Sequence, residues 1–235
     1  MLATAVLAAL LLAASGAGYR HDVWTLRTAF TMLRWAAYVA VGVGALSLVG
    51  MLVSRPVGRA TVVLGVALAV AAATAGIPWR LKQRASQVPP IHDVTTDTQD
   101  PPQFVAVLPL RAGAKNSAAY GGDSVAALQR SGYPDLAPVI SELSPAAAFA
   151  RARTTAAEIG WTLVAADSVA GRIEATATTR WFGFKDDVVV RVRPEGAGSR
   201  VDVRSVSRVG GSDVGANAAR VRAFVARMSR ISPPA

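Results

Sequence analysis

Hydrophobic and polar residues follow different patterns in the two parts of this chain. In the first third, three long apolar runs carry no charged residue: Leu2–Ala14, Trp35–Val53 and Ala60–Ile77. The second and third runs are each long enough to cross a hydrocarbon core of about 30 Å as a helix. The sequence therefore predicts a membrane region with about three transmembrane helices in residues 1–84.

The first apolar run has two interpretations, an uncleaved transmembrane helix or a signal peptide that ends near residues 13–18. A signal peptide usually begins with basic residues, whereas here Leu2 follows Met1 directly, which favours the uncleaved helix. The basic and aromatic stretch 19–34 separates the first two runs, and we expect it to lie at the membrane interface.

From about residue 85 the chain changes to short segments that alternate apolar and polar residues. Four such segments predict strands: 161–167, 171–181, 187–194 and 199–209. Their separators are short and turn-forming, which indicates antiparallel pairing, because parallel strands need long crossovers. A further strand is predicted at 137–144, and the apolar stretch 104–110 predicts either a short strand or a strap over the core.

The apolar faces of the last two strands predict how they pair. Matching these faces places Val190 opposite Val203, and Arg191 opposite Asp202 on the exposed face of the sheet. An exposed ion pair of this kind contributes only about 0.2–1 kcal/mol.

Two helices are predicted in this part of the chain. Ser144 and Pro145 form a helix start, since a capping hydroxyl precedes a proline at the first helical position. The last helix follows Ser212 or Asp213 and has an apolar stripe. The stripe comprises Val214, Ala218, Val221, Val225 and Met228. The order of elements predicts an α+β domain in residues 85–235, an antiparallel sheet with two packed helices in a helix-grip-like arrangement.

Charge and composition narrow the classes of function. The net charge is +10, with eight basic residues against one acidic in residues 1–85 and seventeen against fourteen in residues 86–235. Most of the excess therefore flanks apolar segments, where it meets lipid headgroups, and nucleic-acid binding is not predicted. The chain has no cysteine, which excludes disulfides, thiolate metal sites and a cysteine nucleophile.

The stretch "PPIHDVTTDTQDPPQF" at residues 89–104 is the first candidate site. Its His92, Asp93, Thr95 and Asp97 predict a polar clamp, in which side chains satisfy backbone groups of an irregular segment. The alternative is a nitrogen–oxygen metal site that adds Asp100. The spacing of these residues in an extended chain does not make ligands converge, so we predict neither a metal, nor another cofactor, nor catalytic residues.

The stretch "RWFGFKDDVVVRV" at residues 180–192 is the second candidate. Its first residues predict a binding surface for a partner or a membrane if they are exposed, and an end-cap of the core if they fold inward. The candidate surface comprises Arg180, Trp181, Phe182, Phe184 and Lys185. Asp186 and Asp187 are not predicted to act as paired acid and base, because adjacent strand residues point to opposite faces.

Three longer strings carry a family resemblance. "IHDVTTDTQDPPQF", "GRIEATATTRWFGFKDDVVVRV" and "GSRVDVRSVSRVGGSDVGANAARVRAF" closely resemble the bacterial and plastid family called domain of unknown function 1499, over about residues 88–230. The three-span leader is similar to that of alphaproteobacterial members. The resemblance carries no catalytic residue, because no activity is established for the family. It implies a bacterial inner membrane location.

The side of the membrane that the soluble domain faces has conflicting indications. The count of basic residues favours the cytoplasm. Shorter members of the family look like exported lipoproteins, which favours the periplasm. Of the two sides, the periplasm is slightly favoured.

Three classes of function stay open. The first is a membrane-anchored binding module at the cell envelope, with the lipid bilayer and envelope proteins as partners. The second is a carrier or sensor of an apolar ligand in a cavity between sheet and helix. An enzyme is the least favoured, because the sequence contains no phosphate loop, nucleophile elbow or HExxH motif.

Overall fold

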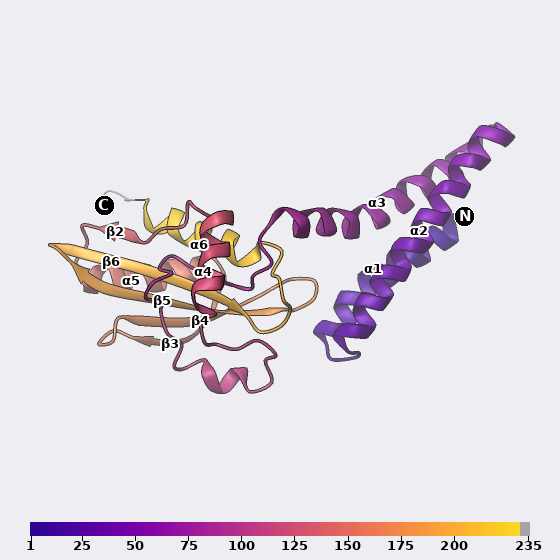
Figure 1. Ribbon diagram of the computed structural model, residues 1–235. Helices are drawn as coiled ribbons and strands as arrows, with labels where there is room; N and C mark the ends of the chain where they lie inside the picture. The colour runs from indigo at the N-terminus through magenta and orange to yellow at the C-terminus, as the bar shows by residue number, and fades with distance from the viewer. Residues whose placement is uncertain (231–235) are drawn as a thin grey trace. The chain divides into compact units, whose positions relative to one another are not determined.

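The computed structural model describes residues 1–230, which form two compact units (Figure 1). The amino-terminal unit comprises Met1–Arg84 together with Thr179–Gly183. The second unit comprises Ala85–Thr178 and the chain from Phe184 onwards, and it contains the sheet.

Three helices make up most of the amino-terminal unit: α1 (Leu2–Arg20), α2 (Leu26–Ser54) and α3 (Arg59–Gln87). Each is long and apolar enough to cross a membrane. Much of the stretch 19–34 is helical, because α2 begins at Leu26, where the Thr25 hydroxyl accepts a hydrogen bond from the Thr28 amide. The interfacial position of this stretch stays a prediction. The third helix is also longer than its apolar run, since it continues through Pro78.

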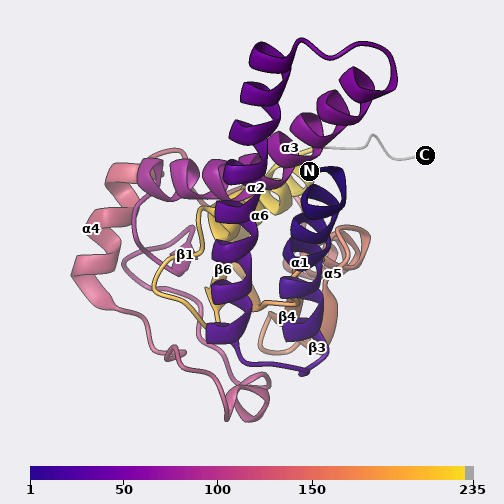
Figure 2. The same cartoon turned by 90° about the vertical axis from the view of Figure 1, so that its right-hand side faces the viewer.

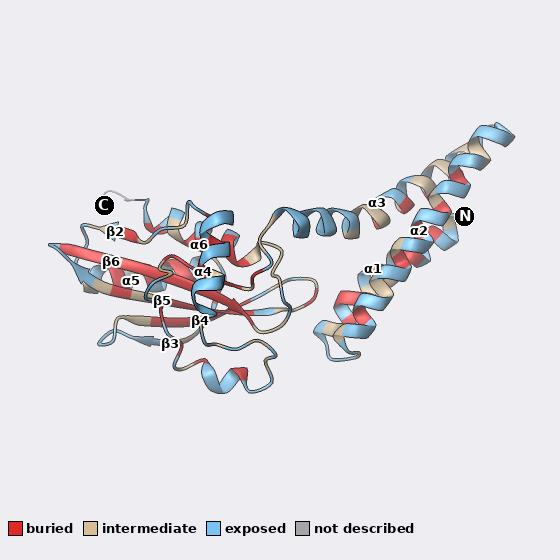
Figure 3. Cartoon of the chain, in the orientation of Figure 1, coloured by how far each residue is buried: buried red, intermediate tan, exposed pale blue. Residues whose placement is uncertain are grey.

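Small residues hold α1, α2 and α3 together. Their shared buried cluster is mostly alanine and lies along α1, α2 and α3: Ala5, Ala8, Ala40, Val43, Ala67 and Ala71. Figure 2 shows α1 and α2 side by side. Small side chains let helix backbones approach closely, which is how helices associate where surrounding lipid is as apolar as the helix surface. Large apolar side chains such as those of Leu7, Leu46 and Leu52 are exposed instead, and Figure 3 colours much of the three helices as exposed.

The second unit is built on an antiparallel sheet. Its main path runs in the order β1 (Asp93–Thr95), β6 (Gly198–Ser207), β5 (Lys185–Glu195), β4 (Arg172–Thr178) and β3 (Thr162–Asp167). The short strand β2 (Val139–Ser141) also pairs with β6. The predicted hairpin is confirmed, because Val190 pairs with Val203 and Arg191 with Asp202. The predicted α+β class is confirmed as well.

One face of the sheet is covered by helices. Side chains from α5 (Pro145–Glu158) and α6 (Ala216–Met228) pack against the apolar face of β4, β5 and β6. The indole of Trp161 stacks on the ring of Phe224 with their centroids 5.3 Å apart. Ser144 caps α5 as predicted, because its hydroxyl accepts a hydrogen bond from the Ala147 amide.

Two local predictions differ from the structure. The stretch 104–110 is not a strand; it is irregular and leads into the short 3-10 helix η1 (Leu108–Arg111). The residues 93–95 do form a strand, although Pro, Thr and Asp around them indicate turns. These residues pair with β6, and the Gln129 side chain of helix α4 (Gly122–Gly132) bonds the other edge of β1 at Thr95.

Candidate functional site

The face of the sheet that α5 and α6 leave open is covered by one long segment, Thr96–Tyr120, here called the strap. Phe104 and Val107 of the strap pack on Val189 and Val206 of the sheet. These four residues make a small apolar contact. Around it, charged side chains of the strands project from the same face, because side chains alternate along a strand.

The buried ion pair of Asp93 and Arg204 is the first of these charged contacts. Nε and Nη2 of Arg204 donate to the two oxygens of the Asp93 carboxylate, at 2.9 and 2.7 Å, and both side chains are buried. Arg204 also donates to the carbonyl of Pro102 and lies over the rings of Phe104 and Tyr120. Burial raises the pKa of the Tyr120 hydroxyl to about 12, with the Asp93 charge adding to the effect. This contact joins β1, β6 and both ends of the strap.

The edge of β1 is closed by a side-chain amide. The amide of Thr95 donates to Oε1 of Gln129 at 2.9 Å, and Nε2 of Gln129 donates to the Thr95 carbonyl at 2.6 Å. Gln129 thus pairs with Thr95 as a neighbouring strand would. The Thr95 hydroxyl in turn accepts from the Asp97 amide, which starts the strap with a local turn.

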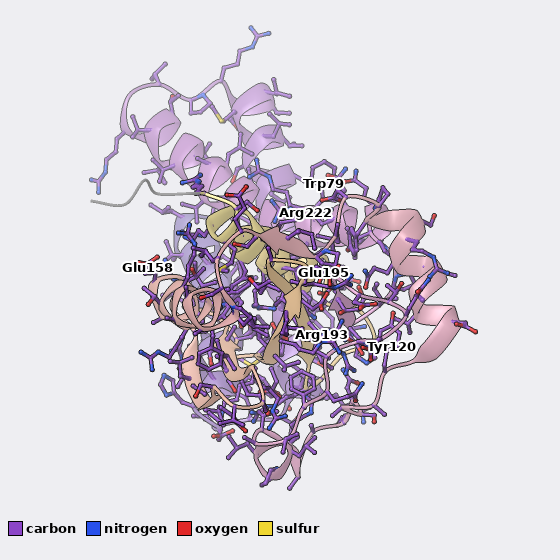
Figure 4. All side chains as sticks on the ribbon, turned by 90° about the vertical axis from the view of Figure 1, so that its left-hand side faces the viewer. Trp79, Tyr120, Glu158, Arg193, Glu195 and Arg222 are labelled. Atoms are coloured by element: carbon purple, nitrogen blue, oxygen red, sulfur yellow. The ribbon has the colours of Figure 1, made fainter. Side chains whose placement is uncertain are left out.

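A second charged cluster lies where the strap leaves the sheet. Asp97 and Asp202 share Arg191, Arg193 and Arg200, and Asp100 contacts the first two. Figure 4 shows Arg193 among the crowded polar side chains of this region. Burial acts to raise the pKa of Asp97, but amide hydrogen bonds from Asp100 and Gln99 and the nearby guanidinium groups lower it overall.

The register of Arg191 and Asp202 was predicted correctly, but the exposure of the pair was not. Asp202 is fully buried, because the strap covers it and Thr96 lies against its carboxylate. The pair therefore belongs to a shared network of three arginines and is more than an isolated surface contact.

Asp187 is the centre of a third cluster. Its carboxylate accepts hydrogen bonds from Arg111 of the strap at 2.5 Å, from Arg208 at 2.8 and 2.9 Å and from Thr176 at 2.7 Å. Burial alone would raise the pKa of Asp187, yet the hydrogen bonds from Arg208, Thr176 and Arg111 lower it below its ordinary value of 3.8. The carboxylate is therefore charged at neutral pH and acts as an anchor for the strap.

A pH titration of stability tests the role of Asp187. A carboxyl group whose folded pKa is lowered contributes stability above its unfolded pKa and loses it as the pH falls through the folded value. We expect the free energy of unfolding to decline below about pH 4, and the Asp187→Asn variant to show a smaller decline over the same window. An equal decline in the free energy of unfolding of the two proteins below this pH would contradict this assignment.

Glu174 holds the strap in a different way, through backbone amides. Its buried carboxylate accepts hydrogen bonds from the amides of Val105, Ala106 and Val107, at 2.9–3.1 Å, and from Nε of Arg172. No arginine of the strap is involved here. One side chain of β4 thus fixes three consecutive backbone groups just before η1.

The segment that Glu174 fixes carries exposed apolar residues. We call Val105–Leu110 the tip. The exposed fractions of Val105, Leu108 and Leu110 are 51%, 45% and 54%, and Pro109 is exposed as well. In Figure 1 the turn that contains η1 projects from the sheet, and Figure 3 colours most of it as exposed. The tip is therefore an apolar projection on a well-anchored backbone.

Of the predicted clamp residues, His92 precedes β1, Asp93 and Thr95 lie in β1, and Asp97 lies at the start of the strap. Asp93, Thr95 and Asp97 make the contacts described above. The carbonyl of His92 accepts hydrogen bonds from the Ser207 amide and from the Asn217 side chain. Within residues 1–230, no group of three or more His, Asp or Glu side chains is placed to hold a metal ion.

The second predicted candidate is divided between the two units. Arg180, Trp181 and Phe182 fall in Thr179–Gly183, which groups with the amino-terminal helices. Phe184 and Lys185 belong to the sheet unit, where Lys185 opens β5. The five residues are thus not one surface of a single unit.

Sequence reasoning missed the residues that hold β1 and the strap in place. Arg204, Glu174, Asp187 and Gln129 lie 34 to 111 positions away from their partners in the chain. A signal was present, because charged residues recur at alternate positions on the polar face of β4, β5 and β6. An unusual density of charge on one strand face indicates that something polar covers it.

Comparison with known proteins gave one match. The family described as protein of unknown function (DUF1499) matches residues 93–228, which include the sheet, the strap and helices α4, α5 and α6. Searches of curated proteins and of solved structures found no match to the chain.

Proposed function

The chain belongs to the DUF1499 family of proteins of unknown function, and we propose that it is a binding module held at the cell envelope by its apolar helices. Three helices that can cross a membrane make it a membrane-anchored protein. Nearly the whole family match lies in the sheet unit, so we assign the proposed binding role to that unit.

The tip is the observation that carries this proposal. Folded proteins expose single apolar residues routinely, but neighbouring large ones on a projection indicate an interaction surface. Val105, Leu108 and Leu110 are exposed together although Glu174 and Arg111 hold their backbone firmly. A prearranged apolar surface loses little conformational entropy when it binds, which favours a binding role.

The other two classes of function receive less support. Asp93, Asp187 and Glu174 each accept hydrogen bonds from arginines or backbone amides, which gives these carboxylates a structural role. The space between sheet and helix that a carrier would use is occupied by the stacked rings of Trp161 and Phe224.

We place the protein in a bacterial inner membrane with the sheet unit in the periplasm. The resemblance to exported family members supports this side, against the count of basic residues. Three spans put the loop after α1 and the sheet unit on the same side. Reporter fusions after Asp22 and Gln87 should therefore agree with each other, and a fusion after Gly58 should report the opposite side. Disagreement between the first two would exclude three spans.

Site-specific crosslinking in native membranes tests the binding role. The chain has no cysteine, so a single photoreactive label can be attached at Leu108→Cys without background. We expect this label to capture a defined target. Labels at Val169→Cys and Ile140→Cys, which replace apolar residues exposed to 99% and 64%, are the matched controls. Equal capture at all three positions, or none at Leu108, would defeat the proposal.

A further inference from the structure

The tip has the chemistry of a group that enters a lipid surface. We propose that Val105, Leu108 and Leu110 insert into the headgroup–acyl boundary of an anionic bilayer and form a second, peripheral contact of this membrane-anchored protein. The inference rests on the proposed binding function and names the partner of the same surface.

The backbone N–H groups of the tip already have hydrogen-bond partners. The amides of Val105, Ala106 and Val107 donate to the Glu174 carboxylate. Those of Leu108 and Leu110 donate to the carbonyls of Val105 and Val107, and Pro109 has no amide hydrogen. Every backbone N–H group from 105 to 110 thus has a partner. Lipid offers no replacement partner for an N–H group, so the pairing of these donors is one condition that a segment must meet to leave water.

The same feature disfavours a peptide partner that adds a strand. A strand that binds by extending a sheet needs unpaired backbone donors and acceptors on the receiving edge. Here the donors are used by Glu174 and by the turn itself. What the tip offers is apolar side chains on a convex turn, which suits insertion.

Charge around the tip suits an anionic surface. Between Asp100 and Asp123 the only charged residues are Arg111 and Lys115. Arg111 is buried on Asp187, and Lys115 is exposed five residues beyond Leu110. Acidic residues, which phosphate headgroups would repel, are therefore missing from the twenty-two residues 101–122, and Glu174, whose carboxylate contacts the tip, is buried. Juxtamembrane lysines add to binding at anionic leaflets.

The membrane helices tether the sheet unit, so the bilayer is present at a high local concentration for the tip. The apolar run of α3 ends at Ile77 and β1 begins at Asp93, so fifteen residues connect the end of this run to the first strand of the sheet. Tethering makes the second contact intramolecular, and a weak apolar contact then suffices.

The test uses the full-length chain in vesicles of phosphatidylcholine and phosphatidylglycerol. A polarity-sensitive fluorophore is attached at Leu108→Cys, and quencher-bearing lipids report its depth. We expect a blue-shifted emission and strong quenching at this position, against water-like emission and little quenching at Val169→Cys and Ile140→Cys. Lys115→Glu should reduce quenching at position 108 in these vesicles but not in vesicles of phosphatidylcholine alone.

The outcomes separate this inference from the proposed function. Water-like emission at position 108, or equal quenching at all three positions, overturns lipid insertion. If crosslinking at Leu108 in native membranes still captures a protein, the binding function survives with a different partner. If both experiments fail at Leu108, both proposals fail.

Discussion

Replacing Asp93 by alanine is expected to lower the free energy of unfolding of the sheet unit by about 3–5 kcal/mol, the usual cost of breaking a buried ion pair. The loss is large because Arg204 would keep its charge while it is buried between Phe104 and Tyr120. Sequence reasoning alone gives only about 1–3 kcal/mol here, the cost of one orphaned hydrogen-bond partner.

Hydrogen exchange of β6 amides in the full-length chain measures this loss, because the readout is confined to the sheet. Asp135→Ala is the matched control: Asp135 also forms a paired contact, with Arg222, but both side chains are largely exposed. Such a pair contributes about 0–1 kcal/mol. Comparable losses in the two variants would show that the Asp93–Arg204 pair is not the anchor that its burial indicates.

A double variant separates the charge from the packing. Asp93→Leu combined with Arg204→Met removes both charges and keeps apolar volume, and it should recover part of the stability lost by Asp93→Ala, since apolar residues often replace buried pairs at little cost. Recovery is expected to be incomplete, because Arg204 also donates to the carbonyls of Pro102 and Ala118.

The elements that the sequence predicts well are those whose signals are local. Ser144 and Pro145 define the start of α5, and the alternation in β5 and β6 places Val190 opposite Val203. Both depend on neighbours within a few positions. The start of α2 at Leu26 was not predicted, because the basic and aromatic residues of 19–34 indicate a membrane interface but do not define where a helix begins.

The strap shows why the candidate site was only partly predictable. Asp93 and Asp97 were identified as polar residues that need partners, but their partners come from β5 and β6, about a hundred positions away. Pairing over that distance depends on which strand face the strap crosses. The sequence alone does not specify this, because the residues of 96–120 have no periodic pattern. The exposed tip was not predicted for the same reason, because the apolar stretch "FVAVLPL" is equally compatible with a buried strand and with an exposed turn.

Replacing Glu174 by alanine is expected to release the tip while the sheet stays folded. Three amides, those of Val105, Ala106 and Val107, would lose their acceptor in a buried setting. An orphaned buried group costs about 1–3 kcal/mol, so the segment gains by lifting away from β4 to reach water. Exchange protection should then be lost at residues 105–107, and fluorescence quenching at position 108 in anionic vesicles should fall with it, whereas protection in β5 and β6 is retained.

The control for Glu174 is Glu195→Ala, which removes an exposed carboxylate at the end of β5, where surface substitutions change stability by less than about 0.5 kcal/mol. Glu174→Gln keeps the shape of the side chain but places an amide donor against backbone donors, so it should also release part of the segment. Unchanged protection at 105–107 in both Glu174 variants would mean that Arg111 and the Phe104–Val107 contact hold the strap by themselves. Loss of protection without loss of quenching would mean that the apolar side chains reach lipid without a preformed tip, and that prearrangement by Glu174 is not what makes the surface bind.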